Sequence, residues 1–307
     1  MAVEAISRGG INVIITASIF LVFSTVIIGL RFVARGRSRT IGIDDWVSLA
    51  SYVFMVGVMV CHLLLFGPYG YGGAPLVEFS PVQLRHFLIM LYACIILYTC
   101  CSTAVKMSIL LLYRRIFVTR VFGIITALLG TVLMIWSLCI LLLQIFFCKP
   151  IHDFWEPTDE KHCLDGPVAY LAISVSNVIW DFTLLLLPLP MIWSLNMTKK
   201  RKLQLCAVFL VGILYVGSTT PICICSVLRV VTLRRWREED VTQTIWGSSI
   251  WTIQECAVGI ICACMPPLAN MFKEWHRKAT QRTRSANSRG FGAQAAKSSP
   301  DTGPNHA

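Results

Sequence analysis

Three ionisable residues, Lys106, Asp181 and Glu255, lie within long apolar segments of the sequence. A charged group inside a membrane is costly and usually faces the interior of a helix bundle or a water-filled cavity. Such groups can bind a ligand, an ion or a proton, and a buried carboxylic acid can act as a general acid. The structural alternative is a network of charges that fixes how the helices pack.

Each of these three residues ends a stripe of polar residues with helical spacing. Spacings of three and four residues place a stripe on one face of a helix. At 1.5 Å per residue, Asp181 and Glu255 lie about 18 and 24 Å from the inner ends of their segments, and Lys106 lies about 9 Å from its own. We therefore expect Asp181 and Glu255 to line one cavity, and Lys106 to balance their charge. The stripes are Thr99, Ser102, Thr103 and Lys106; Ser174, Asn177 and Asp181; and Thr244, Ser248, Thr252 and Glu255.

The elements that must hold these residues are predicted to be seven transmembrane helices. Of the 307 residues, 56% are hydrophobic and 14% are charged, and the mean hydropathy is +0.68. Soluble proteins carry about 25% charged residues, so an ordinary water-soluble fold is excluded. A helix needs about 20 apolar residues to cross a bilayer. The sequence therefore predicts an all-α, polytopic seven-helix bundle with spans at Ile11–Gly29, Trp46–Phe66, Phe87–Leu112, Phe122–Phe146, Val168–Trp193, Leu203–Leu228 and Thr244–Met271.

The distribution of positive charge predicts how the bundle is oriented. Most of the 27 Lys and Arg residues fall after the first, third and fifth spans and in the tail, which places the N-terminus outside and the C-terminus in the cytoplasm. We expect a short extracellular N-terminus at 1–10, the seven-helix domain at 11–272 and a disordered basic cytoplasmic tail at 273–307. The basic inner loops are expected to fix this topology; docking of a cytosolic partner or of anionic lipid is the alternative.

The long apolar segments also predict where the protein resides. We expect a multi-pass protein of the plasma membrane or another membrane of the secretory pathway, surrounded by the lipid bilayer. The sequence contains no nucleic-acid-binding module, so nucleic acid is not an expected partner.

Cys148 and Cys163 flank a polar loop on the predicted outer side. A disulfide is permitted in an oxidising compartment, and this one would stabilise the fold by about 3 kcal/mol in the chain-entropy model. Two free thiols are one alternative, and a zinc site that includes His152 and His162 is another. We expect the disulfide, because it explains the pair most simply, and no metal.

Several local patterns occur together along the chain. They are Asp44-Asp45-Trp46, the run from Lys106 to Phe117, Cys148-x-Pro150 with Trp155 and Cys163, Asp181 before Pro188 and Pro190, Trp251 with Glu255, and Cys262 through Pro266. Over roughly residues 11–272 this set resembles the fungal rhodopsin-like family of integral membrane proteins, of the type encoded in satratoxin clusters. The resemblance implies a fungal seven-helix protein, sometimes receptor-like and sometimes encoded beside enzymes of secondary metabolism. With Trp251, the ligand or proton site candidates are Lys106, Asn177, Asp181 and Glu255.

Three functions fit these features. We favour a receptor-like protein for a small apolar ligand or metabolite; the alternatives are a metabolite transporter and a membrane-embedded, cyclase-like enzyme that uses the buried carboxyls. No residue is assigned a catalytic role and no cofactor is expected. Retinal in particular is not expected, because the last predicted span, Thr244–Met271, contains no lysine to form a Schiff base.

Overall fold

The computed structural model describes residues 8–67, 80–156, 163–188, 190 and 246–268. The chain divides into two compact units, residues 1–265 and 266–307, and the arrangement described below is that of the first. Six helices in the described residues are long and apolar enough to cross a membrane. They are α1 (Arg8–Ser38), α2 (Ile43–Phe66), α3 (Pro81–Ile116), α4 (Arg120–Ile145), α5 (Gly166–Leu186) and the last described helix (Trp246–Leu268), and a short 3-10 helix, η2 (Ile151–Phe154), follows α4.

The all-α prediction is confirmed for the described residues. The first five expected spans coincide with α1 to α5, and the expected span Thr244–Met271 coincides with the last described helix. The expected sixth span, Leu203–Leu228, lies outside the described residues, as do residues 1–7 and the tail at 273–307. The seventh helix and the orientation of the termini therefore stay predictions.

Two helices are longer than their apolar segments. The expected first span stops at Gly29, whereas α1 continues to Ser38 and carries several arginines in its last turns. Helix α3 begins before its apolar run, where the backbone N–H of Ser80 donates to Gln83 Oε1 over 2.9 Å and Pro81 occupies the first helical position. Both features are typical of a helix start, because they satisfy or remove amide donors that have no partner in the first turn.

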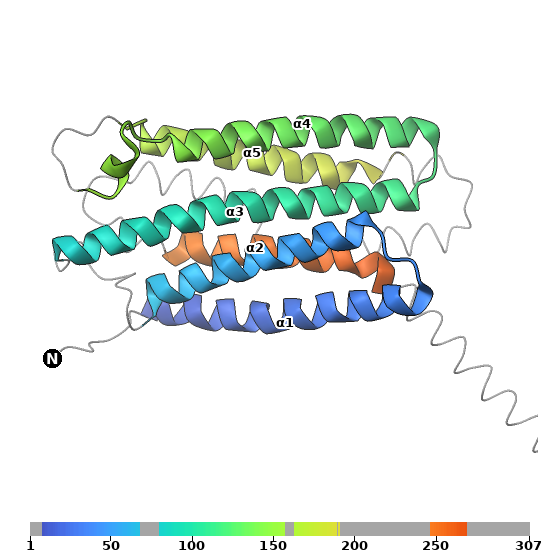
Figure 1. The fold of residues 1–307 in the computed structure, drawn as a ribbon, viewed down its shortest axis with the longest axis horizontal. Coiled ribbons are helices and arrows are strands. Elements are labelled where there is room, and N and C mark those ends of the chain that lie inside the picture. Colours follow the sequence, from blue (N-terminus) through green and yellow to red (C-terminus); the bar gives the residue numbers. More distant parts are fainter. Residues whose placement is uncertain (1–7, 68–79, 157–162, 189, 191–245, 269–307) are drawn as a thin grey trace, which may run out of the picture. The chain divides into compact units, whose positions relative to one another are not determined.

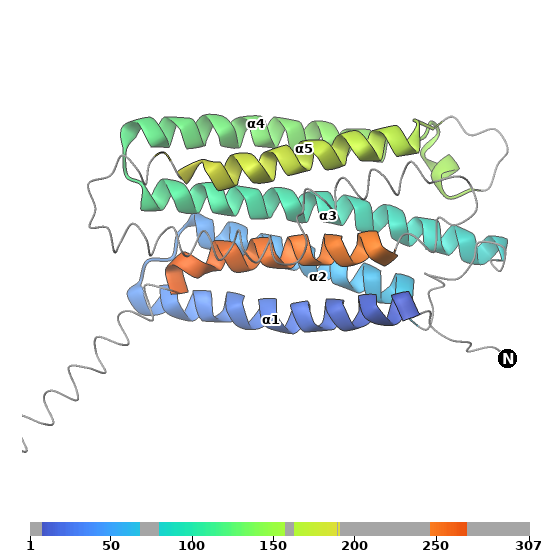
Figure 2. The same ribbon diagram turned by 180° about the vertical axis from the view of Figure 1, so that it is seen from behind.

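Helix α3 is the central element of the first unit. It packs against α2, α4 and α5, and Figures 1 and 2 show it running between the α4–α5 pair and α2 in both views. The last described helix, coloured orange, also borders α3 and α2 in both views. Polar side chains on several faces of α3 can therefore meet polar groups from most of the other helices.

Apolar and polar residues are distributed in the way expected of a protein in lipid. On α4, large apolar side chains such as Leu128, Ile135 and Leu138 are exposed. Buried positions, in contrast, include Arg31 and Lys106. Extended apolar surface is rare on soluble monomers, and intramembrane charges usually face the bundle interior. This pattern supports contact between the described helices and a bilayer.

The last described helix approaches α3 closely at Gly259. A Cβ atom at this position would lie 2.6 Å from Cγ1 of Val105 on α3. Val105 is β-branched and nearly buried, so it has little freedom to move aside. Glycine at position 259 therefore permits the contact between these two helices, as small residues do at helix interfaces in membranes.

We predict that Gly259→Ala lowers the melting temperature of the purified protein. The new methyl group overpacks the contact with Val105, at a cost of about 1–3 kcal/mol. Gly247→Ala on the same helix is the matched control, because a Cβ atom added there would meet nothing within 4 Å. Equal melting temperatures for the two variants would contradict this view of the interface.

Candidate functional site

The centre of the candidate site is the ammonium group of Lys106, which is buried in α3. Lys106 Nζ donates to Ser102 Oγ over 2.7 Å and to Asn177 Oδ1 on α5 over 2.8 Å. It also lies 3.1 Å from Asp181 Oδ1 and 3.9 Å from Glu255 Oε1. A buried charge requires ionic and hydrogen-bond partners. Lys106 therefore joins α3, α5 and the last described helix.

Glu255, on the last described helix, accepts hydrogen bonds from two other helices. Tyr98 Oη on α3 donates to Glu255 Oε2 over 2.7 Å, and Asn177 Nδ2 on α5 donates to Glu255 Oε1 over 2.7 Å. Ser102 Oγ makes a longer bond of 3.5 Å to Oε1. The Glu255 side chain nevertheless remains 22% exposed and lines a cavity.

Asp181 is held by fewer groups than Glu255. Its Oδ1 atom pairs with Lys106, while its Oδ2 atom is covered and has no hydrogen-bond partner among the described residues. The cluster thus contains one formal positive charge, on Lys106, and two formal negative charges, on Asp181 and Glu255. An excess of one formal negative charge among buried groups favours a cationic partner.

A cavity of about 40 Å³ adjoins Glu255 between α3, α4 and α5. A buried water needs roughly 10–15 Å³ of such space, so the cavity has room for a few waters or a small polar group. One part of the cavity wall is polar and another is apolar. Asp181 does not line the cavity. The walls include Ser102, Asn177 and Glu255 on the polar side and Trp136, Ile140 and Val178 on the apolar side.

The structure brings four of the five expected site residues together. Lys106, Asn177, Asp181 and Glu255 are linked by the contacts above, from three polar stripes. Trp251 lies one turn before Glu255, is half-buried and does not line the cavity.

Sequence reasoning missed two aromatic residues of the site. Tyr98 donates to Glu255, and Trp136 lines the cavity. Tyr98 precedes Ser102 by four residues and so extends the polar stripe of α3 by one turn. That spacing was a usable signal for Tyr98, whereas Trp136 lies in an apolar run that gives none.

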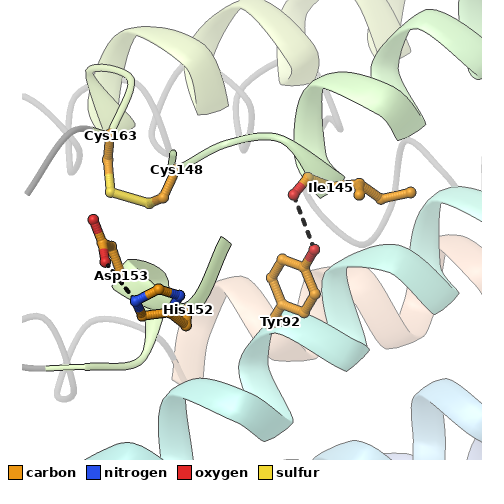
Figure 3. Close-up of a disulfide and its surroundings, with 6 residues drawn as sticks. All are labelled: Tyr92, Ile145, Cys148, His152, Asp153 and Cys163. Atoms are coloured by element: carbon orange, nitrogen blue, oxygen red, sulfur yellow. Dashed lines mark hydrogen bonds and ion pairs between the residues drawn. A yellow bond between two sulfur atoms is a disulfide. The ribbon is translucent and has the colours of Figure 1, made fainter. Parts of the chain in front are cut away.

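The loop after α4 is closed by a disulfide between Cys148 and Cys163. Figure 3 shows this bond above the pair formed by His152 and Asp153, whose Nε2 and Oδ1 atoms lie 3.4 Å apart. His162, considered above as a zinc ligand, lies outside the described residues. In the same view Tyr92 Oη on α3 donates to the backbone oxygen of Ile145 over 3.1 Å. We refer to this part of the first unit as the disulfide end.

A second buried cluster of charges lies at the start of α2 and the end of α3, away from the disulfide end. Arg31 on α1 is completely buried, donates to Asp45 Oδ1 over 2.7 Å and Asp44 Oδ2 over 2.9 Å, and reaches the backbone oxygen of Ala263 over 2.6 Å. Arg115, near the end of α3, donates to Asp44 Oδ1 over 2.8 Å. These bonds connect α1, α2, α3 and the last described helix.

The predicted first span ends at Gly29, which put Arg31 in a basic loop, and this placement was wrong. Arg31 lies inside α1. The helix can continue beyond Gly29 because Asp44 and Asp45 neutralise the guanidinium group of Arg31. A signal was present, since Arg31 and Arg35 are one helical turn apart and two adjacent acids follow a short connection. Counting positive charges for topology conceals such a pairing, because the count treats every arginine beyond an apolar run as solvated.

Comparison with known proteins is consistent with this architecture. The family model described as fungal rhodopsin domain matches residues 30–274. The chain is 28% identical over 263 residues to "Polyenoic acids biosynthesis gene cluster protein Ba17b" of Metarhizium anisopliae, covering 81% of this chain and 70% of that protein. It is 30% identical over 213 residues to a "SAT4 family membrane protein" of Emericella nidulans, covering 67% of this chain but only 52% of that protein. It is 22% identical over 297 residues to "Receptor GIN3" of Arthrobotrys oligospora, covering 93% and 68%.

We predict that Arg31→Met lowers the free energy of unfolding by about 3 kcal/mol, because it leaves Asp44 and Asp45 buried without their main partner. This value is the low end of the usual range, since Arg35 and Arg115 still contact the two acids. Thermal and denaturant unfolding of the purified protein would measure the loss. Arg37→Met, on an exposed position of the same helix, serves as the control and should change stability by less than about 0.5 kcal/mol.

Proposed function

Because the chain belongs to the fungal rhodopsin domain family, we propose that it is a seven-helix, receptor-like membrane protein that binds a small ligand in its polar core. The observation that carries this proposal is the cavity beside Glu255, where a partly exposed carboxylate meets aromatic and polar side chains inside an apolar bundle. Ligand sites typically combine an apolar wall with a few convergent polar groups. The similarity to a protein named as a receptor supports the same role.

The proposed orientation places the disulfide end outside the cytoplasm. Disulfides persist in oxidising compartments and are rare in the cytosol, and the Cys148–Cys163 bond lies at this end. The end of the bundle that holds the Arg31 cluster, Arg115 and the neighbouring basic residues then lies on the cytoplasmic side, as the distribution of positive charge favours. A sixth span at Leu203–Leu228 would return the chain to the outer side before the last described helix.

Glycosylation offers a direct test of this orientation. We predict that the native acceptor tripeptide at Asn196 stays unmodified, because it lies on the cytoplasmic side. A new acceptor created in the disulfide loop by Asp159→Asn with Lys161→Thr should acquire a glycan. An endoglycosidase-sensitive mass shift on a denaturing gel reports both outcomes, and a shift in the native protein that Asn196→Gln removes would reverse the orientation.

A role for the polar core in ligand binding predicts a specific pattern of variant behaviour. Glu255→Gln and Asp181→Asn keep the shape of the side chains and remove their charges. We expect each variant to reach the membrane in at least half the normal amount and to lose the cellular response that deletion of the gene abolishes. Fluorescent tagging measures abundance, and the response is measured in the same cells.

A purely structural role for the carboxyl groups of Asp181 and Glu255 predicts a different result. If the two carboxyls serve only to pack helices, residual function should follow the amount of folded protein. Normal abundance together with a normal response in both variants would reject the proposal. Thr131→Ala on α4 is a suitable neutral control, because it removes an exposed hydroxyl that donates to the backbone oxygen of Ala127 in the same helix.

A role inside a biosynthetic pathway is the second candidate, and the name of the Metarhizium relative favours it. Deletion of the gene followed by profiling of secreted metabolites separates the possibilities. A missing or chemically altered product would favour a membrane-embedded enzyme, and a product retained in the cells would favour a transporter. Unchanged chemistry with a lost response to an external compound supports the receptor-like role.

A further inference from the structure

The short connection between α1 and α2 carries an exposed threonine beside the Arg31 cluster. Thr40 lies two residues after the end of α1 and three before the start of α2. Its backbone N–H donates to the backbone oxygen of Arg35 over 3.1 Å, and Arg115 Nη2 on α3 donates to its backbone oxygen. Thr40 is therefore attached to the end of α3 through Arg115, while its side chain faces solvent.

The charged groups next to Thr40 carry an excess of positive charge. Among the described residues, three arginines of the Arg31 cluster pair with two acids. Arg115 donates through Nη1 to Asp44 over 2.8 Å, and its side chain is 32% exposed. A guanidinium group has five donor hydrogens, so Arg115 can bind a further acceptor and keep Asp44. An anionic group on Thr40 would meet this requirement.

The sequence around Thr40 has the charge pattern of a substrate for a basic-directed protein kinase. Arg37 and Arg39 precede the threonine by three residues and by one, and the apolar Ile41 follows it. All three side chains are exposed. Protein kinases select their substrates partly by such charge patterns, because acidic groups of the kinase pair with arginines near the acceptor hydroxyl. Thr40 therefore combines an accessible hydroxyl with the residues that such a kinase recognises.

The turn that a kinase would have to extend is strained. Arg39 has a φ of 50°, in the left-handed region that residues other than glycine rarely adopt. Two backbone hydrogen bonds close the turn, from Arg39 to Gly36 over 3.2 Å and from Thr40 to Arg35 over 3.1 Å. Extending the chain breaks these bonds but relieves the unfavourable conformation of Arg39. The segment can thus enter a kinase cleft while α1 and α2 stay folded.

We propose that Thr40 is a phosphorylation site and that its phosphate fastens the end of α3 to the connection between α1 and α2. A kinase transfers the γ-phosphoryl group of ATP to Thr40 Oγ1, ADP leaves, and the hydroxyl proton passes to the catalytic base of the kinase. The phosphate adds a charge of about −1.5 to −2 and accepts charge-assisted hydrogen bonds from Arg115. This inference rests on the proposed cytoplasmic position of this end and names a regulation of the bundle there.

Phosphorylation in vitro tests the site. The full-length protein in lipid nanodiscs is incubated with ATP and the catalytic subunit of cyclic-AMP-dependent protein kinase, and peptide mass spectrometry locates the phosphate. We expect phosphate at Thr40, and about 10-fold less of it in Arg37→Gln. Thr119, exposed on the connection between α3 and α4, is the internal control, because no arginine lies three residues before it.

Three results would overturn the site. They are no phosphate at Thr40, an equal amount at Thr119, and phosphate at Ser38 in place of Thr40. Ser38 also follows an arginine by three residues, but it lies within α1. Nanodiscs leave both faces of the protein accessible, so this test succeeds or fails independently of the orientation, which the glycosylation experiment decides.

Hydrogen–deuterium exchange tests what the phosphate does. Phosphorylation should slow amide exchange at 39–42 and 113–117 by about 3- to 10-fold, because new hydrogen bonds hold these segments together. Thr40→Ala treated in the same way should not change, which excludes effects of phosphate elsewhere in the chain. Arg115→Gln should abolish the slowing, whereas Arg114→Gln, at the exposed neighbouring position, should retain it. Unchanged or faster exchange with phosphate at Thr40, or equal slowing in Arg115→Gln, would overturn the role of the phosphate.

Discussion

A buried ammonium group needs acceptors on every side, and Lys106 obtains them from Ser102, Asn177 and Asp181. Lipid cannot replace a missing acceptor, so each of these contacts is costly to lose. Because the acceptors come from α3 and α5, and Glu255 is attached through Asn177, the register of three helices depends on this one group. Packing and the candidate site therefore share the same atoms.

The two buried charged clusters are connected by the last described helix. Glu255 belongs to the Lys106 cluster, and the backbone oxygen of Ala263, eight residues later, accepts from Arg31. Eight residues correspond to about 12 Å along a helix. A ligand that alters how Glu255 is held would thus act on an element whose other end is tied to the Arg31 cluster. A rearrangement of the Arg31 cluster would break some of its hydrogen bonds and form others. The helices would therefore change between alternative packed states rather than deform gradually.

Hydropathy and helical spacing predicted most of the described fold and the meeting point of the polar stripes. The long side chain of Lys106 crosses the depth difference that the residue count implied and reaches Asp181 at 3.1 Å. The spacing rules could not place Arg31, because burial of an arginine depends on acids from another helix. They also could not distinguish Trp136, which lines the cavity, from Trp251, which does not. Hydropathy gives both tryptophans the same value, and only their tertiary positions differ.

The hydrogen bonds around Glu255 also bear on which chemistry the site can support. Tyr98 and Asn177 direct one donor each at its two oxygens, and Lys106 lies 3.9 Å from Oε1. A general acid must instead carry a proton on one oxygen and present it to the substrate. The two oxygens of Glu255 are thus surrounded by donor groups that the protein itself supplies. An arrangement of this kind suits recognition of a hydrogen-bond donor or a cation at the side of Glu255 that lines the cavity.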